Sequence, residues 1–489
     1  MRMEMPGSTR RKVATVSVVL AMAIVIFLST AGLALALTPP PPDATVAAQG
    51  STATTGPAGK IPDVRIPGVS SSDFTDSDVC GECHTEIYKE WQGSMHRNYE
   101  NPAFTWANAQ AAKDTKGLTK DLCVACHTPI GAISGETKGG ETGLSALAKK
   151  GVSCDFCHVI DKVNPDWPGN ASFHVAPGLV KRAQLKDAIS PKHKTAYSKL
   201  HTEADFCGMC HNLSHPLSGV TLEQTYTEWK KSDYAKKGVT CQECHMPPKK
   251  GRAAKQGPVR PKRYTHSFVG ANYRFANEKL AVEDLRKAAK LDMTLSQKEA
   301  TAGSPLRVTI KVMNVGAGHY LPTGLAELRE MWLEVVAKDK AGNELFRDKR
   351  EYGTVLEDAT GRHDKTVPVW KAVKVYRDTR VPPNGSLEEN FDFDLKTQAV
   401  GYVTVDARLW YRSLPVSFTK AAGLAEAKPV EMTRAADRVT MTVPWWSRLF
   451  GGAIGGAIWI PEVLAVIVGV LLLAMIVVAV RGRMKKGRA

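Results

Sequence analysis

Cys80-Gly-Glu-Cys83-His84 is the stretch that decides the class of this chain. Its pattern, two cysteines separated by two residues and followed directly by a histidine, occurs five times. The other copies are Cys123-Val-Ala-Cys126-His127, Cys154-Asp-Phe-Cys157-His158, Cys207-Gly-Met-Cys210-His211 and Cys241-Gln-Glu-Cys244-His245. Together they use all 10 cysteines of the 489-residue chain. Random placement at this composition predicts on the order of 0.01 copies, so the repeats are not a chance occurrence.

The spacing C-x-x-C-H is the attachment pattern of c-type haem. Two thiols at this spacing reach the two vinyl groups of one porphyrin, and the histidine that follows binds the iron from the proximal side. Zinc ribbons also use C-x-x-C pairs, but they do not need a histidine after every pair. Disulfides closed within five such loops would be strained redox centres and not a scaffold. The sequence therefore predicts five covalently bound haem c groups, with the ten cysteines as attachment points and one proximal histidine per motif.

Eight further histidines are available for the distal side of the irons, so a histidine on both sides of every iron is feasible. Such ligation is typical of low-potential, electron-transferring haems, whereas a methionine ligand raises the potential. We expect His96, His266 and His319 to be ligands, and either or both of His193 and His201. The weaker candidates are His174, His215, which could serve a neighbouring iron or bond a propionate, and His363, which a polar surface run explains better.

Several segments resemble the multihaem cytochromes related to hydroxylamine oxidoreductase and its tetrahaem partner. They are Cys80 to His96 with its Glu90-Trp91-Gln-Gly-Ser94-Met-His96 run, Ser190-Pro-Lys-His193 through Cys207-Gly-Met-Cys210-His211, and Glu228-Trp229 leading into Gly238-Val-Thr-Cys241-Gln-Glu-Cys244-His245. The resemblance implies that His96, in its Trp-x-x-Ser-x-His context, is a distal ligand. Tyr264-Thr-His266 and Gly316-Ala-Gly-His319 resemble further distal-ligand segments. The resemblance covers residues 78–275 well and 305–415 loosely.

Both ends of the chain carry apolar segments. Residues 1–37 combine a basic start with 25 uncharged positions from Val13 to Leu37 and indicate a signal peptide or an uncleaved N-terminal anchor. Near the other end, we expect a transmembrane helix over 453–480, because its last 18 residues, Val463 to Val480, are uncharged, and a basic cytoplasmic tail follows at 481–489. The sequence thus predicts a membrane-anchored protein whose soluble domains lie on the periplasmic or extracellular side.

The formal net charge of +16 does not indicate nucleic-acid binding. Half of the excess lies in the basic residues that flank the two apolar ends, and five haems would add roughly ten negative propionates. The globular part would then be close to neutral, so we expect no nucleic-acid partner. The expected partners are the membrane, through the C-terminal helix, and redox proteins such as a quinol oxidoreductase or other cytochromes.

The region between the ends divides into a linker and two domains. Residues 38–72 are rich in Pro, Ala, Thr, Gly and Ser, which is typical of a flexible linker. Residues 73–289 hold all five motifs with short helical runs, as expected where porphyrins fill the interior. Over 290–443 the pattern alternates with period two, for example at 306–312, and favours a β-sandwich. The predicted fold class is α+β multidomain: a mainly α or irregular multihaem domain, a β-sandwich that lends His319 back to it, and a C-terminal transmembrane helix.

The leading functional prediction is electron relay through low-spin haems, from a quinol-linked membrane donor to an external or periplasmic acceptor. The alternative is a haem enzyme with one open-coordinated haem that acts on a small nitrogen or sulfur compound, as some members of the resembling group do. A third interpretation is a filament-forming cytochrome. The sequence shows no second chemical motif and no catalytic residue, which favours the relay.

Overall fold

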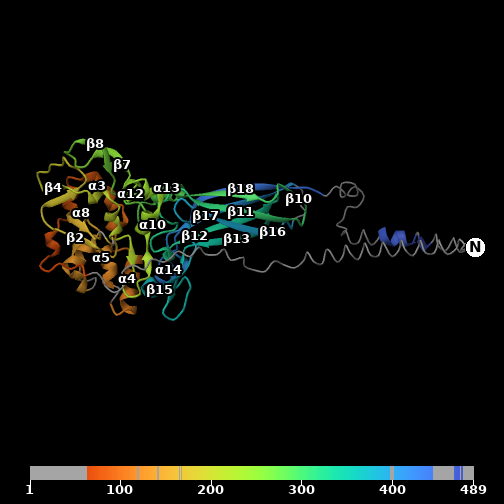
Figure 1. Cartoon of the computed structure of the whole chain (residues 1–489), viewed down its shortest axis with the longest axis horizontal. Helices are drawn as coiled ribbons and strands as arrows, with labels where there is room; N and C mark the ends of the chain where they lie inside the picture. Colours follow the sequence, from red (N-terminus) through yellow and green to blue (C-terminus); the bar gives the residue numbers. More distant parts are fainter. Residues whose placement is uncertain are drawn as a thin grey trace, which may run out of the picture. The chain divides into compact units, whose positions relative to one another are not determined.

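The computed structural model describes residues 63–117, 120–139, 143–164, 166, 168–396, 401–443, 467–473 and 475–476. Contacts within residues 52–489 define one compact unit, so the motif-bearing part and the strand-rich part belong together. Figure 1 shows the two parts side by side: short helices and small hairpins hold the motifs, and long strands follow them. The predicted linker at 38–72 is described only from residue 63, and the predicted N-terminal segment lies outside the described residues.

The motif-bearing part is built from short helices. The α-helices with their bounds are α2 Ser77–Gly81, α3 Thr85–Gln92, α4 Pro102–Asp114, α5 Lys120–His127, α6 Pro129–Ser134, α7 Ala146–Lys149, α8 Cys154–Val159, α9 Asp205–Gly208, α10 Thr225–Lys231, α11 Asp233–Lys236, α12 Cys241–His245 and α13 Glu278–Ala288. Capping residues define several starts: the Asp76 carboxylate accepts from Asp78 N, and Asn101 accepts from the first turn of α4 before its Pro102. Single turns also occur at η1 Ser71–Asp73, η2 Met95–Arg97, η3 Glu136–Gly139 and η5 Leu200–Thr202.

Small two-stranded ribbons link these helices. They pair β1 Ile160–Val163 with β2 Phe173–Val175, β3 Val180–Ala183 with β4 Lys194–Tyr197, β5 Leu213–Ser214 with β6 Thr221–Glu223, and β7 Pro248–Arg252 with β8 Val259–Tyr264. A small apolar core that includes Ile130, Ile133, Phe156 and Ile160 lies between helices and ribbons. Much of the remaining order comes from turns and local hydrogen bonds, so the fold places motifs without long elements.

The strand-rich part is a β-sandwich of two sheets around one apolar core. One sheet has the order β10-β18-β17-β12-β13 and the other β16-β11-β9. The bounds are β9 Ala289–Leu295, β10 Glu299–Ala300, β11 Pro305–Asn314, β12 Glu330–Asp339, β13 Glu344–Tyr352, β16 Ser386–Asp394, β17 Gly401–Arg412 and β18 Val430–Met441. Alternate residues of β11, β12 and β17 are buried, as the period-two pattern predicts. Val308, Ile310, Leu333 and Val405 are fully buried in this core.

Between the sandwich strands lie a few further elements. A separate ribbon pairs β14 Thr354–Asp358 with β15 Ala372–Asp378, and short turns occur at η6 Ala326–Leu328, η7 Val369–Lys371 and α14 Val416–Ala421. The loop from β11 to β12 carries His319, so the sandwich presents this residue toward the motif-bearing part through the contacts described below.

The prediction of a C-terminal transmembrane helix over 453–480 is wrong for the part of the chain that the structure describes. Within those residues no helix is long and apolar enough to cross a membrane. The described helical residues near that end are 467–473 and 475–476. A span of a bilayer needs about 20 residues in one helix. An uncharged run in the sequence therefore does not by itself establish such a helix.

Candidate functional site

Each C-x-x-C-H motif occupies about one helical turn. The cysteines and histidine of three motifs lie within α5, α8 and α12, whereas the first and fourth motifs begin in α2 and α9 and run on into the next turn. In a helix, residues three and four apart share a face. This conformation places both thiols and the imidazole of one motif on the same side, which is the arrangement that porphyrin attachment needs. None of the ten cysteines forms a disulfide in the described part of the chain.

Four of the five motif histidines face a second histidine ring. The pairs and their centroid separations are His84 with His193 at 6.4 Å, His96 with His211 at 6.2 Å, His158 with His266 at 6.4 Å, and His245 with His319 at 6.2 Å. The interplanar angles lie between 16° and 29°. Each pair joins one motif histidine to one histidine from a distant segment.

These separations test whether the residues present fit a haem iron. Two imidazoles on one metal have ring centres about 6 Å apart, because each metal–nitrogen bond is about 2 Å and each ring centre lies about 1 Å beyond its nitrogen. The observed 6.2 to 6.4 Å agree with that spacing. The donor set therefore fits haem with a histidine on each side of the iron at four sites.

Hydrogen bonds at Nδ1 orient the proximal rings. The acceptors are backbone carbonyls for three of them: Ala253 O at 2.7 Å from His84, Arg182 O at 2.6 Å from His158 and Val269 O at 2.5 Å from His245. When Nδ1 donates its proton in this way, Nε2 is left as the metal-binding nitrogen. The distal rings follow the same rule, with His319 Nδ1 2.9 Å from Tyr320 O and His266 Nδ1 3.2 Å from Tyr264 O.

The fourth proximal ring, His211, has a carboxylate partner. Its Nδ1 lies 3.1 Å from Oε1 of Glu223 on β6. Burial by itself would lower the pKa of His211, but the hydrogen bond and the charge of Glu223 outweigh it and raise the pKa to about 9. Burial would likewise raise the pKa of Glu223, and the His211 contact reverses this and lowers it. A carboxylate beside a metal-binding imidazole makes the ligand more electron-donating.

Burial keeps other ligand candidates neutral. It lowers the pKa of His96 to about 3 and those of His127 and His266 to about 4. Desolvation is the largest cause in each case, and neighbouring histidines add to it for His96. Neutral imidazole is the form that binds a metal, so these side chains need to lose no proton at pH 7.

His127 differs from the other four motif histidines. Among the described residues no histidine ring faces it at the spacing of the four pairs. Phe104 of α4 stacks on its ring instead, at a centroid separation of 3.9 Å and an angle of 15°. The side chains near His127 therefore supply one nitrogen ligand for an iron and an aromatic wall.

Two distal histidines are held by contacts to remote segments. The backbone of His96 accepts from Val152 N at 2.8 Å, and Trp91 Nε1 donates to Val152 O at 2.9 Å. The loop of His319 is fixed by Glu228 on α10, whose Oε2 accepts from Tyr320 N at 3.1 Å and from Thr323 Oγ1 at 2.7 Å.

The other carboxylate oxygen of Glu228 binds Arg380. Oε1 lies 2.6 Å from Nη1 of Arg380, and the guanidinium also contacts Asp378 at 2.8 Å. Glu228 is 4% exposed and Arg380 is 8% exposed. We call Glu228, Asp378 and Arg380 the interdomain ion cluster, because it joins α10 of the motif-bearing part to the segment that follows β15.

The remaining candidate histidines have other partners. His201 lies near His158, at a centroid separation of 5.7 Å, but its Nε2 is 3.0 Å from Cys157 O. His215 accepts from Leu217 N and Ser218 N and contacts Trp370 O. The exposed His174 pairs with Asp161, and His363 stacks on Tyr376 at 3.8 Å. We infer that His193, and not His201, completes the set of distal ligands with His96, His266 and His319.

Thiols of different motifs affect one another's pKa. Cys154 raises the pKa of Cys80, Cys126 raises that of Cys210, and Cys241 raises that of Cys207. Cys157 lies close to both Cys207 and Cys210. Attachment points of different motifs are therefore near one another in the fold.

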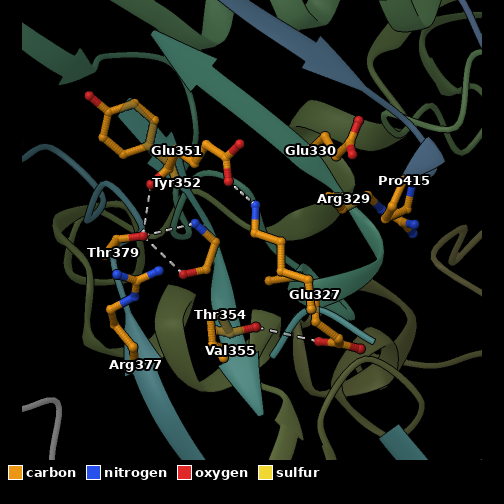
Figure 2. A pocket seen from close by; sticks show the side chains of 13 residues that line it. Glu327, Arg329, Glu330, Glu351, Tyr352, Thr354, Val355, Arg377, Thr379 and Pro415 are labelled. Atoms are coloured by element: carbon orange, nitrogen blue, oxygen red, sulfur yellow. Dashed lines mark hydrogen bonds and ion pairs between the residues drawn. The ribbon is translucent and has the colours of Figure 1, made fainter. Parts of the chain in front are cut away.

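A small pocket on the sandwich side contains none of these histidines (Figure 2). Its residues include Glu327, Arg329, Glu351, Lys365 and Arg377, and a volume of about 20 Å³ holds little more than a water molecule. Glu327 is 8% exposed, and its Oε1 has no hydrogen-bond partner among the described residues. Burial raises the pKa of this carboxyl to about 7. The pocket is too small for a cofactor or an organic substrate.

Sequence reasoning missed three features of the site. Glu223 lies twelve positions after His211 in a short strand, and no motif marks it. The stacking of Phe104 on His127 and the interdomain ion cluster depend on segments that are distant in the sequence. Only the fold brings such residues together, so no local pattern could have shown them.

Comparison with known proteins agrees with a multihaem cytochrome. The family model described as cytochrome c554 and c-prime matches residues 79–159. No curated protein matches the chain. Among solved structures, a penta-heme cytochrome c552 from Thermochromatium tepidum aligns with a TM-score of 0.57 and 20% identity over 75% of this chain and 99% of that chain. Spo0M, a sporulation control protein from Bacillus subtilis, aligns over 32% of this chain and 51% of its own at 14% identity. The TM-score of this alignment, 0.16, is too low to indicate a shared fold.

The family match, the shared fold and the motifs together indicate a multihaem c-type cytochrome with covalently bound haem c. The more specific relationship to the hydroxylamine oxidoreductase group stays a prediction, because neither match names that group.

Proposed function

We propose that this multihaem c-type cytochrome carries five haem c groups and relays electrons between redox partner proteins. The observation that carries the proposal is the set of four histidine pairs at 6.2 to 6.4 Å. Histidine on both sides of an iron favours low-spin sites that exchange electrons without binding a substrate. Bound haem iron supplies the one-electron chemistry, and the chain supplies ligands, burial and placement.

The electrostatic interactions between thiols of different motifs support a continuous route through the molecule. Cys80 interacts with Cys154 and so joins the first motif to the third, and Cys157 interacts with the cysteines of the fourth motif. From the fourth motif, Cys210 leads to Cys126 of the second motif and Cys207 leads to Cys241 of the fifth. We propose that electrons follow this order, with two branches beyond the fourth site.

The proposed setting is the periplasmic or extracellular side. Its support is the apolar, basic-flanked start of the chain and the C-x-x-C-H motifs, because haem is attached to such motifs outside the cytoplasm. A quinol-linked protein is the proposed donor, and a soluble or extracellular protein the proposed acceptor.

A second candidate function rests on His127. A haem held there with no second histidine keeps one iron position for an exogenous ligand, as a haem enzyme acting on a small nitrogen or sulfur compound requires. Phe104 stacks on the His127 ring and shapes an apolar environment around it. This candidate predicts catalysis at one site and relay through the other four.

The deciding experiment combines a haem count by pyridine haemochrome with low-temperature EPR of the oxidised protein. We expect five haems per chain, four of them low-spin. Fewer than four low-spin haems would contradict the relay. The fifth signal decides the second candidate: a high-spin signal that shifts with nitrite, hydroxylamine or sulfite and accompanies turnover supports an enzyme, whereas an unreactive fifth haem leaves the relay alone.

A further inference from the structure

The hairpin of β7 and β8 carries an unusual concentration of positive charge. Residues 248–264 contain seven basic and no acidic side chains: Lys249, Lys250, Arg252, Lys255, Arg260, Lys262 and Arg263. Arg263 is buried against Glu90, and Lys249 also pairs with Glu90. Lys250, Lys255 and Lys262 are exposed, and the structure gives their side chains no ion pair. Their charge therefore faces solvent.

A second basic segment lies beside this hairpin. The loop before β4 carries Lys186 and Lys192, β4 begins at Lys194, and all three lysines are exposed. The one acid of the loop, Asp187, is paired with Arg260 of β8 at 2.9 Å. Figure 1 shows β4, β7 and β8 in the motif-bearing part, away from the sandwich. The ion pair between Asp187 and Arg260 thus joins two basic segments into one surface and neutralises the acid that would interrupt it.

Apolar side chains are exposed within the same surface. Ile189 of the loop is 96% exposed, Val259 at the start of β8 is 48% exposed, and Tyr197 of β4 is 46% exposed with Lys186 over its ring at 5.0 Å. Exposed apolar residues surrounded by charge are typical of protein–protein interfaces. Ile189 is two residues from Asp187, and Val259 precedes Arg260, so these apolar residues flank the Asp187–Arg260 ion pair in the sequence.

This surface adjoins the histidine pair of the first motif from both sides. Ala253 O, in the hairpin, accepts from Nδ1 of His84, and Lys255 N donates to Cys83 O at 2.9 Å. His193, which faces His84 at 6.4 Å, lies between Lys192 and Lys194 of the loop. A protein that covers this surface would therefore lie next to the segments that hold His84 and His193.

We propose that the basic surface formed by residues 186–194 and 248–262 is the docking site of an acidic electron-transfer protein that exchanges electrons through the His84–His193 site. The inference rests on the proposed relay. It adds the site at which electrons enter or leave the protein and the charge of the partner protein. Opposite charge steers such partners to productive encounters, and a small apolar centre holds the short-lived complex. A lipid surface would use the charge but has no need of an iron site beneath it.

The test compares two variants with the same change of net charge. The surface variant is Lys186→Glu, Lys250→Glu and Lys262→Glu, and none of these residues contacts a haem-binding side chain in the structure. The control variant is Lys290→Glu, Lys311→Glu and Lys338→Glu, on exposed positions of the sandwich strands. The probe is an acidic flavodoxin. Its binding is measured by calorimetry with both proteins oxidised, and its electron transfer by stopped flow across a range of ionic strength.

We expect the surface variant to bind flavodoxin at least about tenfold more weakly at low ionic strength and to lose most of the salt dependence of its reduction rate. The control variant keeps both. Ile189→Ser weakens binding at high salt too, because its contribution does not depend on charge. Equal losses of flavodoxin binding in the two lysine variants, or equal retention of it, would overturn the docking site. So would a surface variant that loses binding to anionic vesicles but keeps its binding to flavodoxin.

Photoreduced lumiflavin, which carries no charge, separates this proposal from the relay itself. If lumiflavin reduces all variants at one rate while flavodoxin does not distinguish them, the docking site is wrong and the relay stands. If neither reagent reduces the haems of the wild-type protein, the relay fails.

Discussion

At the scale of single residues, His158 shows how closely a ligand and a bystander can resemble each other. Two rings lie near it, His266 at 6.4 Å and His201 at 5.7 Å. Their hydrogen bonds differ: Nδ1 of His266 contacts Tyr264 O and leaves Nε2 for the iron, whereas Nε2 of His201 is held by Cys157 O. From the sequence we expect His266 to be a ligand and either or both of His193 and His201, because local pattern does not separate histidines in similar polar surroundings.

This difference gives a paired prediction. His266→Ala removes an iron ligand, so we expect one low-spin EPR signal to be replaced by a high-spin signal while the haem count stays unchanged. His201→Ala leaves all low-spin signals in place, because it removes only a hydrogen bond to a backbone carbonyl. A high-spin signal in His201→Ala with none in His266→Ala would exchange the two roles.

Glu223 sets a second residue-scale prediction. Its carboxylate, 3.1 Å from Nδ1 of His211, makes that imidazole a stronger donor and so favours ferric over ferrous iron. We expect Glu223→Gln to raise the midpoint potential of one haem, by about 60 mV for each tenfold change in relative affinity. A spectroelectrochemical titration measures it. Glu299→Gln, at an exposed position of β10, is a control, and an unchanged set of five potentials in Glu223→Gln would contradict this role.

What sequence analysis gave at this scale follows from chain geometry. The predicted proximal histidines can be read directly, because each follows two cysteines on about one helical turn. The histidines that we propose as distal ligands come from loops such as those of His193 and His319, and their pairing depends on how four ribbons and a sandwich fold back. No local pattern encodes such a pairing, so it appears only in the structure.

At the scale of elements, the interdomain ion cluster joins α10 to the sandwich. Glu228 binds Arg380 and the backbone of Tyr320 together, so it fixes the residue next to His319. Breaking a buried ion pair leaves a charge without its partner, which costs about 3–5 kcal/mol. We expect Glu228→Ala to lower the free energy of unfolding by that amount and to loosen His319.

The measurement for this cluster has two parts. Thermal unfolding reports the loss of stability, and EPR reports a high-spin fraction from the His245–His319 site. Arg307→Ala is the comparison, because it breaks an ion pair with Asp392 in which both side chains are more than half exposed, and such pairs contribute little. Equal destabilisation in the two variants, with unchanged EPR, would show that the cluster has no positioning role.

The elements also show which sequence signals were informative. Alternation over 306–312 corresponds to β11, because one-sided burial imposes its period on the sequence. The run Gln224 to Lys236 forms two helices, α10 and α11, divided at Ser232, whose side chain caps the second. Hydropathy alone was misleading near the C-terminus. An uncharged run is compatible with a membrane environment, but it does not establish that a long helix forms.

At the scale of the whole molecule, the raised pKa of Glu327 makes the free energy of unfolding depend on pH. Burial raises its folded-state pKa to about 7, above the 4.5 expected in the unfolded chain. The folded protein therefore binds the proton more tightly, and the stabilisation is complete below about pH 4.5 and lost as pH rises to about 7. We expect Glu327→Gln to be more stable than wild type at pH 8, by up to about 3 kcal/mol, and similar to it near pH 4.5.

Thermal midpoints across pH 4.5 to 8 test this expectation. Glu299→Gln, at an exposed position of β10, provides the matched control and should leave the pH profile unchanged. A parallel shift of the Glu327→Gln midpoint at every pH would assign the gain to packing and not to proton binding.

The four histidine pairs also bear on how the protein is made. Each pair joins residues that lie about 70 to 115 positions apart along the chain. Bringing the two histidines together therefore closes a long loop and costs conformational entropy. Synthesis proceeds from the N-terminus, and His319 is the last partner to emerge. We expect the His245–His319 site to be the last of the four to gain both of its histidines, because His319 lies in a loop of the sandwich.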